Sequence, residues 1–169
     1  MKIIFGTTNK RKVSDLMEVI KQLNLNIEVL GLTDIGWSLG EIEETGQTIE
    51  ENSLIKAKAI YDFCLEKNIN YPIITDDAGL FVHHLNGEPG VYTARYADKE
   101  LADNKELPKY YGVIKLLNKL NGIENRDAIY QCCVTCMMPD GTYFQEIGES
   151  KGRIVEEIVG ELTRPYFYS

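Results

Sequence analysis

The chain opens with a short strand, a glycine turn and a helix. Residues 3–5 are a β-branched and aromatic run, and Gly6 follows directly. Apolar residues then recur at helical offsets, at Val13, Leu16, Met17, Ile20 and Leu23. A side-chain oxygen of Thr8 or Asn9 is suited to accept a hydrogen bond from the first turn, so one of these residues is expected to cap the helix.

The first turn of this predicted helix carries three cations, Lys10, Arg11 and Lys12. Cations at a helix N-terminus oppose the helix dipole, at a cost of roughly 0.3–1 kcal/mol each when exposed. One interpretation is an anion site, in which backbone N–H groups and a lysine ammonium converge on phosphate oxygens. The other is a solvated helix surface, because the turn lacks the glycine spacing of a phosphate-binding loop.

An acidic loop precedes a second predicted helix. Glu43 and Glu44 lie between two glycines, and Thr48 with Glu51 forms a capping-box pattern at the helix start. The apolar stripe that follows is Leu54, Ala57, Tyr61 and Cys64, and the adjacent face carries Asn52 and Lys56, four residues apart. The two glutamates are either part of a site or an ordinary solvated loop.

Two adjacent carboxylates, Asp76 and Asp77, follow a predicted buried strand at residues 72–75. Repulsion and desolvation disfavour two ionised groups there, and a hard divalent cation such as Mg²⁺ would compensate both effects. One aspartate could then hold the ion while its neighbour polarises a water molecule. The alternative is a polar β-turn, because Asp-Asp-Ala-Gly is also typical of turns.

Other polar features allow less specific interpretations. Arg95, in a glycine-punctuated loop at residues 86–97, could bind phosphate bidentately or stabilise a surface ion pair.

Cys133 and Cys136 have metal-ligand or redox spacing, but residues 128–138 are apolar enough for a buried strand and no further ligands lie nearby in sequence. Core thiols are therefore expected. The adjacent His83 and His84 are expected to be solvated or hydrogen-bonded.

Composition excludes several classes of partner. The chain has 169 residues and a formal net charge of −8, which provides no broad cationic surface for a nucleic-acid polymer or an anionic membrane. No apolar run approaches the ~18 residues of a membrane span. Four cysteines without a spaced disulfide pattern are expected to be reduced. We therefore expect one cytoplasmic domain over residues 1–169.

Six motifs occur in order along most of the chain: Thr7-Thr8-Asn9-x-x-Lys12, Glu43-Glu44-Thr45-Gly46, Glu51-Asn52-x-x-x-Lys56-Ala57, Thr75-Asp76-Asp77-Ala78-Gly79-Leu80, residues 89–96 (PGVYTARY) and Gly152-Arg153-Ile154-Val155. In this order they resemble the inosine/xanthosine triphosphate pyrophosphatases. These house-cleaning enzymes hydrolyse non-standard purine nucleoside triphosphates, such as dITP, ITP and XTP, to the monophosphate and pyrophosphate.

The resemblance implies an α/β fold with a long mixed β-sheet, flanking helices and two lobes around a central cleft. It also implies a homodimer and a single nucleoside triphosphate pyrophosphatase domain.

The resemblance further implies a role for each matching residue. The triphosphate would be held by Thr7, Thr8, Asn9 and Lys12, with Lys56 nearby. Glu43 or Glu44, together with Asp76 or Asp77, would bind Mg²⁺. Asp77 would be the proton acceptor, and Ala78 stands where relatives usually carry serine, so one substrate hydrogen bond is missing or comes from the backbone.

These roles describe a consistent reaction. A water activated by metal and carboxylate attacks the α-phosphorus and expels pyrophosphate, while Lys12, Lys56, Arg95 and Mg²⁺ neutralise the phosphate oxygens. The bound polyphosphate would also supply the negative charge missing from the first helix turn.

The C-terminal segment departs from the family where the base is recognised. Relatives carry Gly-Phe-Gly-Tyr-Asp-Pro-x-Phe and, later, Ser-His-Arg; in residues 160–167 only Gly160, Pro165 and Phe167 match. Either a C-terminal helix is missing, or this protein recognises the nucleotide base differently, with Tyr166 or Tyr168 able to stack on the base. The alternative function is a nucleotide-binding protein of the same fold with altered or lost base specificity and little turnover.

Overall fold

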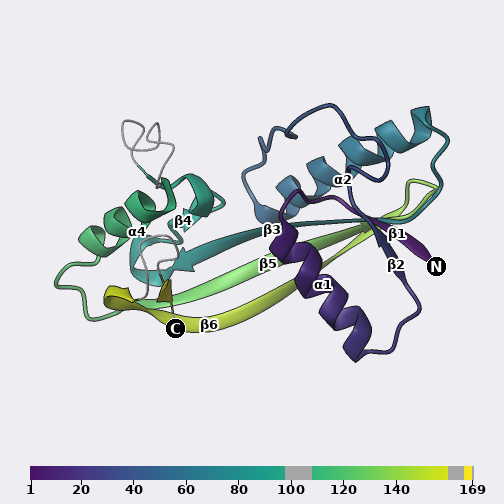
Figure 1. Cartoon of the computed structure of the whole chain (residues 1–169). Coiled ribbons are helices and arrows are strands. Elements are labelled where there is room, and N and C mark those ends of the chain that lie inside the picture. Colours follow the sequence, from purple (N-terminus) through teal and green to yellow (C-terminus); the bar gives the residue numbers. More distant parts are fainter. Residues whose placement is uncertain (98–107, 160–165, 169) are drawn as a thin grey trace. The chain divides into compact units, whose positions relative to one another are not determined.

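The computed structural model describes residues 1–97, 108–159 and 166–168, with side chains for 1–97 and 111–158 (Figure 1). The helices are α1 (Lys10–Gln22), α2 (Ile49–Glu66) and α4 (Pro108–Lys119), with short 3₁₀ turns η1 (His83–Leu85) and η2 (Thr93–Arg95). The strands are β1 (Lys2–Phe5), β2 (Glu28–Leu30), β3 (Ile73–Val82), β4 (Pro89–Gly90), β5 (Asp127–Met137), β6 (Tyr143–Val159) and β7 (Tyr166–Tyr168). Residues 160–165, within the predicted base-reading departure, and the side chains of Tyr166 and Tyr168 lie outside the described part.

The strands form one mixed sheet in the order β2-β1-β3-β5-β6-β7, with β4 paired to β3. Strand β1 runs parallel to both β2 and β3, whereas the β3–β4 and β6–β7 pairs are antiparallel. Helices and parallel strands alternate in the N-terminal half, as crossover connections require. The expected α/β class with a mixed sheet is confirmed.

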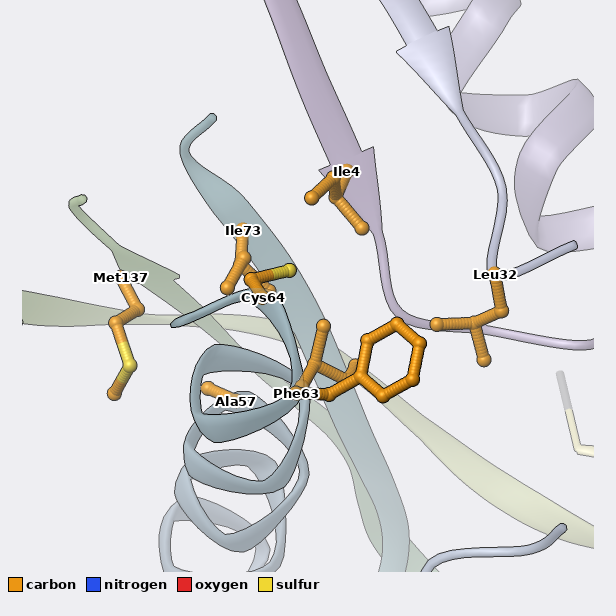
Figure 2. Close-up of a cluster of buried hydrophobic side chains, with 8 residues drawn as sticks. Ile4, Leu32, Ala57, Phe63, Cys64, Ile73 and Met137 are labelled. Atoms are coloured by element: carbon orange, nitrogen blue, oxygen red, sulfur yellow. The ribbon is translucent and has the colours of Figure 1, made fainter. Parts of the chain in front are cut away.

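The chain divides into two compact units. The first comprises residues 1–77 and 133–147, and the second comprises 78–132 and 148–169. The core of the first unit forms where α2 packs on the sheet (Figure 2), and its buried side chains include Ile4, Ala57, Phe63, Cys64, Ile73 and Met137. Each large aliphatic or aromatic side chain buried in this way contributes roughly 1.5–3 kcal/mol.

The second unit has a core of its own, built on α4. Its buried side chains are Leu80, Val82, Leu116, Leu120, Ala128 and Ile154. Arg126 lies beside this core with only 5% of its surface exposed. Its guanidinium donates to three backbone carbonyl oxygens, those of Leu120 (2.6 Å), Ile154 (2.8 Å) and Val155 (2.6 Å). Backbone dipoles therefore solvate this buried cation.

Strand β3 continues through the segment that the turn interpretation assigned to a β-turn. Residues Asp76 to Gly79 are part of the ten-residue strand Ile73–Val82, so the turn interpretation is wrong. Gly79 allows this continuation, because a Cβ atom there would lie 2.6 Å from the carbonyl oxygen of Gly90 on β4. The glycine thus serves close strand pairing, which turn chemistry alone does not reveal.

The predicted core thiols are confirmed. Cys133 is buried, Cys136 is half-buried, and all four cysteines are free. The two residues are three apart on β5, so their side chains point to opposite faces of the sheet and cannot share one metal ion. Burial raises the pKa of the Cys136 thiol, which keeps it protonated near neutral pH. His83 and His84 are exposed on η1, as the solvated interpretation requires.

Two further features concern the periphery. The loop after β2 carries Trp37, whose ring packs against Phe63 in a tilted arrangement, with a centroid distance of 5.1 Å and an interplanar angle of 60°. Its Nε1 donates to the Gly40 carbonyl oxygen at 2.9 Å. Among the described residues, no helix has the length and apolar character needed to cross a bilayer.

Candidate active site

The candidate site begins where β1 ends. Phe5 lies opposite Ile74 in the parallel β1–β3 pair, and the Gly6 N–H donates to the Ile74 carbonyl oxygen at 2.8 Å. A Cβ atom on Gly6 would lie 2.4 Å from Ile60 Cδ1 and 2.7 Å from Thr75 Cγ2, so the chain can pass here only as glycine. This close approach starts α1 beside the aspartates of β3.

Helix α1 begins as its sequence predicts. Thr7 Oγ1 accepts from the Asn9 N–H at 3.1 Å, and Asn9 Oδ1 caps the helix by accepting from the Arg11 N–H at 3.0 Å. Within the first turn of the helix, Lys12 Nζ donates to Asp76 Oδ2. The charge that opposes the helix dipole is therefore compensated by a carboxylate of the protein itself. Of the predicted phosphate-binding residues here, Thr8 and Asn9 are exposed.

The adjacent aspartates point in opposite directions. Consecutive side chains alternate across a strand, and Asp76 contacts Lys12 on α1 while Asp77 contacts Lys56 on α2. Each carboxylate thus has its own ammonium group. This arrangement removes the repulsion that the sequence raised as a problem, and it does so without bringing the two carboxylates together.

Two carboxylates converge at Lys56 instead. Its Nζ lies 2.7 Å from Glu44 Oε1 and 3.5 Å from Asp77 Oδ1. The side chains of Lys56 and Asp77 are each 13% exposed and that of Glu44 is 30% exposed, so water screens this cluster only partly. Glu43 is exposed, and in the described part of the chain no ion pair joins its carboxylate to Lys56.

The start of α2 fixes the end of the acidic loop. Thr48 Oγ1 accepts from the Glu51 N–H at 3.1 Å, which confirms the predicted cap. The Glu51 carboxylate accepts from the N–H of Gln47 at 2.6 Å, one residue before the position expected in a capping box. Asn52, completely buried, contacts both the loop and Asp77.

Next to Asn52, a buried line of hydroxyl groups holds α2 against the sheet. Ser53 Oγ lies 2.7 Å from Thr135 Oγ1 on β5, and Thr75 Oγ1 donates to the Ser53 carbonyl oxygen at 2.7 Å. Gln145 on β6 extends the line by donating to Thr135 Oγ1 at 2.9 Å. Periodicity did not reveal these residues, because a polar side chain in a core position interrupts an apolar pattern.

The structure brings most of the predicted site residues into the first unit. Lys12 with Asp76, and Lys56 with Glu44 and Asp77, form two neighbouring ion-pair groups on the two faces of β3. Two predicted residues belong to the second unit, Ala78, directly after Asp77, and Arg95, exposed at the end of η2. Their predicted roles stay predictions.

The donor set suits a hard divalent cation that is shared with a substrate. Among the described residues, no three His, Cys, Asp or Glu side chains gather closely enough to hold an ion alone. Mg²⁺, however, commonly takes one or two carboxylates and completes its shell with water and phosphate oxygens. Glu44 and Asp77, which converge on one ammonium group, match that requirement.

Lysines from two helices meet carboxylates on a strand of the mixed sheet, and this makes the chain an α/β protein whose site combines ammonium and carboxylate groups. The comparisons place it more narrowly: the sequence matches the Ham1 family over residues 3–166, and the chain belongs to that family. The resemblance seen in the motifs is thereby confirmed.

Named relatives and solved structures agree. The dITP/XTP pyrophosphatase of Clostridium perfringens is 36% identical over 162 residues, covering 94% of this chain and 75% of the relative. That of Listeria innocua is 38% identical over 161 residues, covering 94% and 72%. Among solved structures, the Staphylococcus aureus Ham1 protein has a TM-score of 0.74 and 32% identity, covering 95% of this chain and 76% of that one. A Coxiella burnetii HAM1 protein has a TM-score of 0.77 and 27% identity over the same shares.

Proposed function

We propose that the chain hydrolyses non-standard purine nucleoside triphosphates, such as dITP, ITP and XTP, to the monophosphate and pyrophosphate with Mg²⁺ as cofactor. The enzyme class follows from the family, whose curated members matching 94% of this chain are dITP/XTP pyrophosphatases. The observation that carries the proposal is the convergence of Glu44 and Asp77 on Lys56.

Family membership implies a divalent cation, and Mg²⁺ is our choice because the available donors are carboxylate oxygens. Glu44 and Asp77 would hold it. When bound, such an ion neutralises phosphate charge and makes a nearby water more acidic. Lys56, which now lies between these carboxylates, would then contact a phosphate oxygen.

The chain's own residues would orient the triphosphate. The turn from Thr7 to Asn9 and the first N–H groups of α1 present donors where a helix N-terminus favours an anion. Lys12 adds a full positive charge at this end, with Asp76 holding its ammonium in place. Arg95 and the backbone at Ala78 would complete the contacts with the substrate.

The reaction needs one base and a charge-stabilising group. Asp77 would accept a proton from the attacking water as its oxygen bonds to the α-phosphorus. The bond between that phosphorus and the bridging oxygen breaks, and pyrophosphate leaves with the bonding electron pair. Lys12 and Lys56 would stabilise the negative charge on the transferred and leaving phosphates, and Asp77 would return the proton to solvent.

Pyrophosphate release from a panel of triphosphates tests the proposal. With Mg²⁺ present, dITP, ITP and XTP should be cleaved faster than the standard nucleotides, and Asp77→Asn should abolish cleavage of all of them. Asp62→Asn, which changes an exposed carboxylate on the same helix as Lys56, is the matched control. Release that Asp77→Asn leaves undiminished would remove Asp77 from the role of base.

The departure of residues 160–167 from the family pattern favours a second candidate function. A nucleotide-binding protein of the same fold would bind triphosphates with Mg²⁺ but release little pyrophosphate. Calorimetric binding measured alongside turnover separates the two functions, because only an enzyme shows both.

We also propose that the protein acts in the cytoplasm as a homodimer. Four free cysteines suit a reducing compartment, where the nucleotide pool lies. The dimer rests on the family resemblance, and light scattering coupled to size-exclusion chromatography would give its mass directly.

A further inference from the structure

Asn52 is a buried polar residue to which the proposed reaction gives no role. It is the fourth residue of α2 and is 0% exposed. Its Oδ1 accepts from the Gly46 N–H at 2.8 Å, and its Nδ2 donates to Asp77 Oδ2 at 3.1 Å. A single amide thus joins the acidic loop to the aspartate on β3.

Chemistry fixes which way this amide points. A carboxylate oxygen only accepts hydrogen bonds, so Asp77 requires the NH₂ end of Asn52, and a backbone N–H only donates, so Gly46 requires the oxygen end. Rotating the amide by half a turn would place oxygen against oxygen and N–H against N–H. The two contacts therefore reinforce each other in one orientation.

The loop approaches Asn52 more closely than any residue with a side chain would allow. A Cβ atom on Gly46 would lie 2.7 Å from Asn52 Oδ1 and 2.7 Å from Glu51 Cβ. Gly46 is only two residues after Glu44, so fixing its backbone also limits where the Glu44 carboxylate can reach. The absence of a side chain at Gly46 thus serves the contact with Asn52.

Asn52 is itself firmly held. The next residue, Ser53, is fully buried and exchanges hydrogen bonds with Thr75, with Ser53 Oγ donating to the Thr75 carbonyl oxygen at 3.3 Å. Thr75 lies two residues before Asp77 on the same face of β3. These hydrogen bonds therefore hold α2 against β3 immediately beside the Asn52–Asp77 contact.

We propose that Asn52 is a positioning residue, which holds the Asp77 carboxylate and the Glu44 loop in the relation needed to bind the cation and activate water. The inference rests on the proposed function. A neutral amide suits this task because it occupies one lone pair of Asp77 Oδ2 and adds no positive charge.

Asn52→Leu tests the inference, because it keeps the approximate size and removes both hydrogen bonds. We expect kcat for dITP at saturating Mg²⁺ to fall about 10- to 100-fold, the usual effect of removing a group that orients a metal ligand. The KM for dITP should change less than about threefold, because the two hydrogen bonds of Asn52 go to Gly46 and Asp77, which are not among the proposed triphosphate contacts. Binding of Mn²⁺ without nucleotide, followed by calorimetry, should weaken about tenfold or more.

Two further variants make the result decisive. Ser53→Ala removes a buried hydroxyl on the same turn but keeps the Ser53 carbonyl oxygen that accepts from Thr75 Oγ1 at 2.7 Å. It should therefore lower the melting temperature and leave kcat and Mn²⁺ affinity within about twofold. Gly46→Ala disturbs the loop contact while Asn52 keeps its donor for Asp77. Gly46→Ala should lower kcat and Mn²⁺ affinity, as Asn52→Leu does. If Asn52→Leu does not fold, Gly46→Ala alone tests the positioning role.

The outcomes separate the two proposals. Folded Asn52→Leu with wild-type kcat and Mn²⁺ affinity, or with losses no larger than those of Ser53→Ala, would overturn the positioning role and leave the proposed function intact. A wild-type protein that releases no pyrophosphate from any triphosphate would overturn the proposed function. The Mn²⁺ comparison would then still decide whether Asn52 organises the two carboxylates.

Discussion

Asp76 and Asp77 are neighbours in sequence whose carboxylates contact ammonium groups on different helices, Lys12 on α1 and Lys56 on α2. Replacing each aspartate should therefore have a different kinetic effect. Asp77→Asn removes the proposed base, so kcat should fall at least about 100-fold. Asp76→Asn releases the Lys12 side chain, so it should raise KM for the triphosphate more than it lowers kcat. Steady-state kinetics with dITP measures both, and equal effects on kcat would contradict the division of roles.

Glu43 and Glu44 can be separated by amide substitution. Glu44 contacts Lys56 at 2.7 Å, whereas Glu43 is exposed. Glu44→Gln should therefore raise the Mg²⁺ concentration needed for half-maximal activity about tenfold or more, and Glu43→Gln should leave it nearly unchanged. Activity measured against Mg²⁺ concentration gives the answer, and the reverse order would assign the metal to Glu43.

Lys56→Met should lower the stability of the protein and make that stability depend on added metal. The substitution leaves Glu44 and Asp77 facing one another without their shared cation, in a region where both are largely shielded from water. We expect a loss of about 1–3 kcal/mol, less than the breaking of a fully buried pair, because Glu44 retains some exposure. Mg²⁺ should raise the melting temperature of the variant more than that of the wild type, and chelation with EDTA should reverse the gain. A similar response in both proteins would argue against a metal between these carboxylates.

Arg126→Met should destabilise the second core. The change removes three hydrogen bonds and leaves the carbonyl oxygens of Leu120, Ile154 and Val155 without that donor. We expect the free energy of unfolding to fall by about 2–4 kcal/mol. Chemical denaturation measures it, with Arg153→Met at an exposed position as the control. A loss no larger than that of the control would mean that water replaces the guanidinium at little cost.

The contact between Glu88 and Lys119 predicts a weak dependence of stability on pH. The hydrogen bond from Lys119, and a second from Tyr96, lower the pKa of Glu88 below its ordinary value. A lowered carboxylate pKa contributes stability above the unfolded value, about 4.3, and that stability is lost as pH falls through the folded value. The effect should be small because both side chains are about half exposed, at 51% and 40%.

Glu88→Gln tests that dependence. The melting-temperature difference between wild type and variant should be present at pH 7 and shrink toward zero below the folded pKa. A difference that stays constant down to pH 2 would show that charge is not its source.

Local signals predicted the elements well, because capping and periodicity act within a few residues. Asn9 and Thr48 cap α1 and α2 as their side chains suggest, and residues 3–5 and 73–75 are strands. The apolar stripe predicted at residues 13–23 is less buried than expected, because two of its members, Met17 and Leu23, are 48% and 62% exposed. A periodic pattern shows which side chains share a face, and the surroundings of that face decide their burial.

The site was only partly predictable, because its geometry depends on contacts between distant segments. The sequence identified Lys12, Lys56, Asp76 and Asp77 as charged residues near predicted strand or helix ends. It could not show that Asp77 shares the Lys56 ammonium group with Glu44 and not with Asp76, because this depends on β3 continuing past Thr75 and on alternation across it. The positioning of Asn52 and the solvation of Arg126 likewise require tertiary contacts that no local pattern encodes. That residues 1–169 act as one pyrophosphatase domain stays a prediction.

Trp37 gives the chain a natural optical probe. It is the only tryptophan, its ring packs at a tilt against Phe63 of the first core, and its indole N–H donates to the carbonyl oxygen of Gly40, four residues before Glu44. Light emitted by an indole shifts toward longer wavelengths as water gains access to it. Intrinsic emission therefore reports on the segment that leads into the acidic loop, with no label attached, each time a cation or a nucleotide is added.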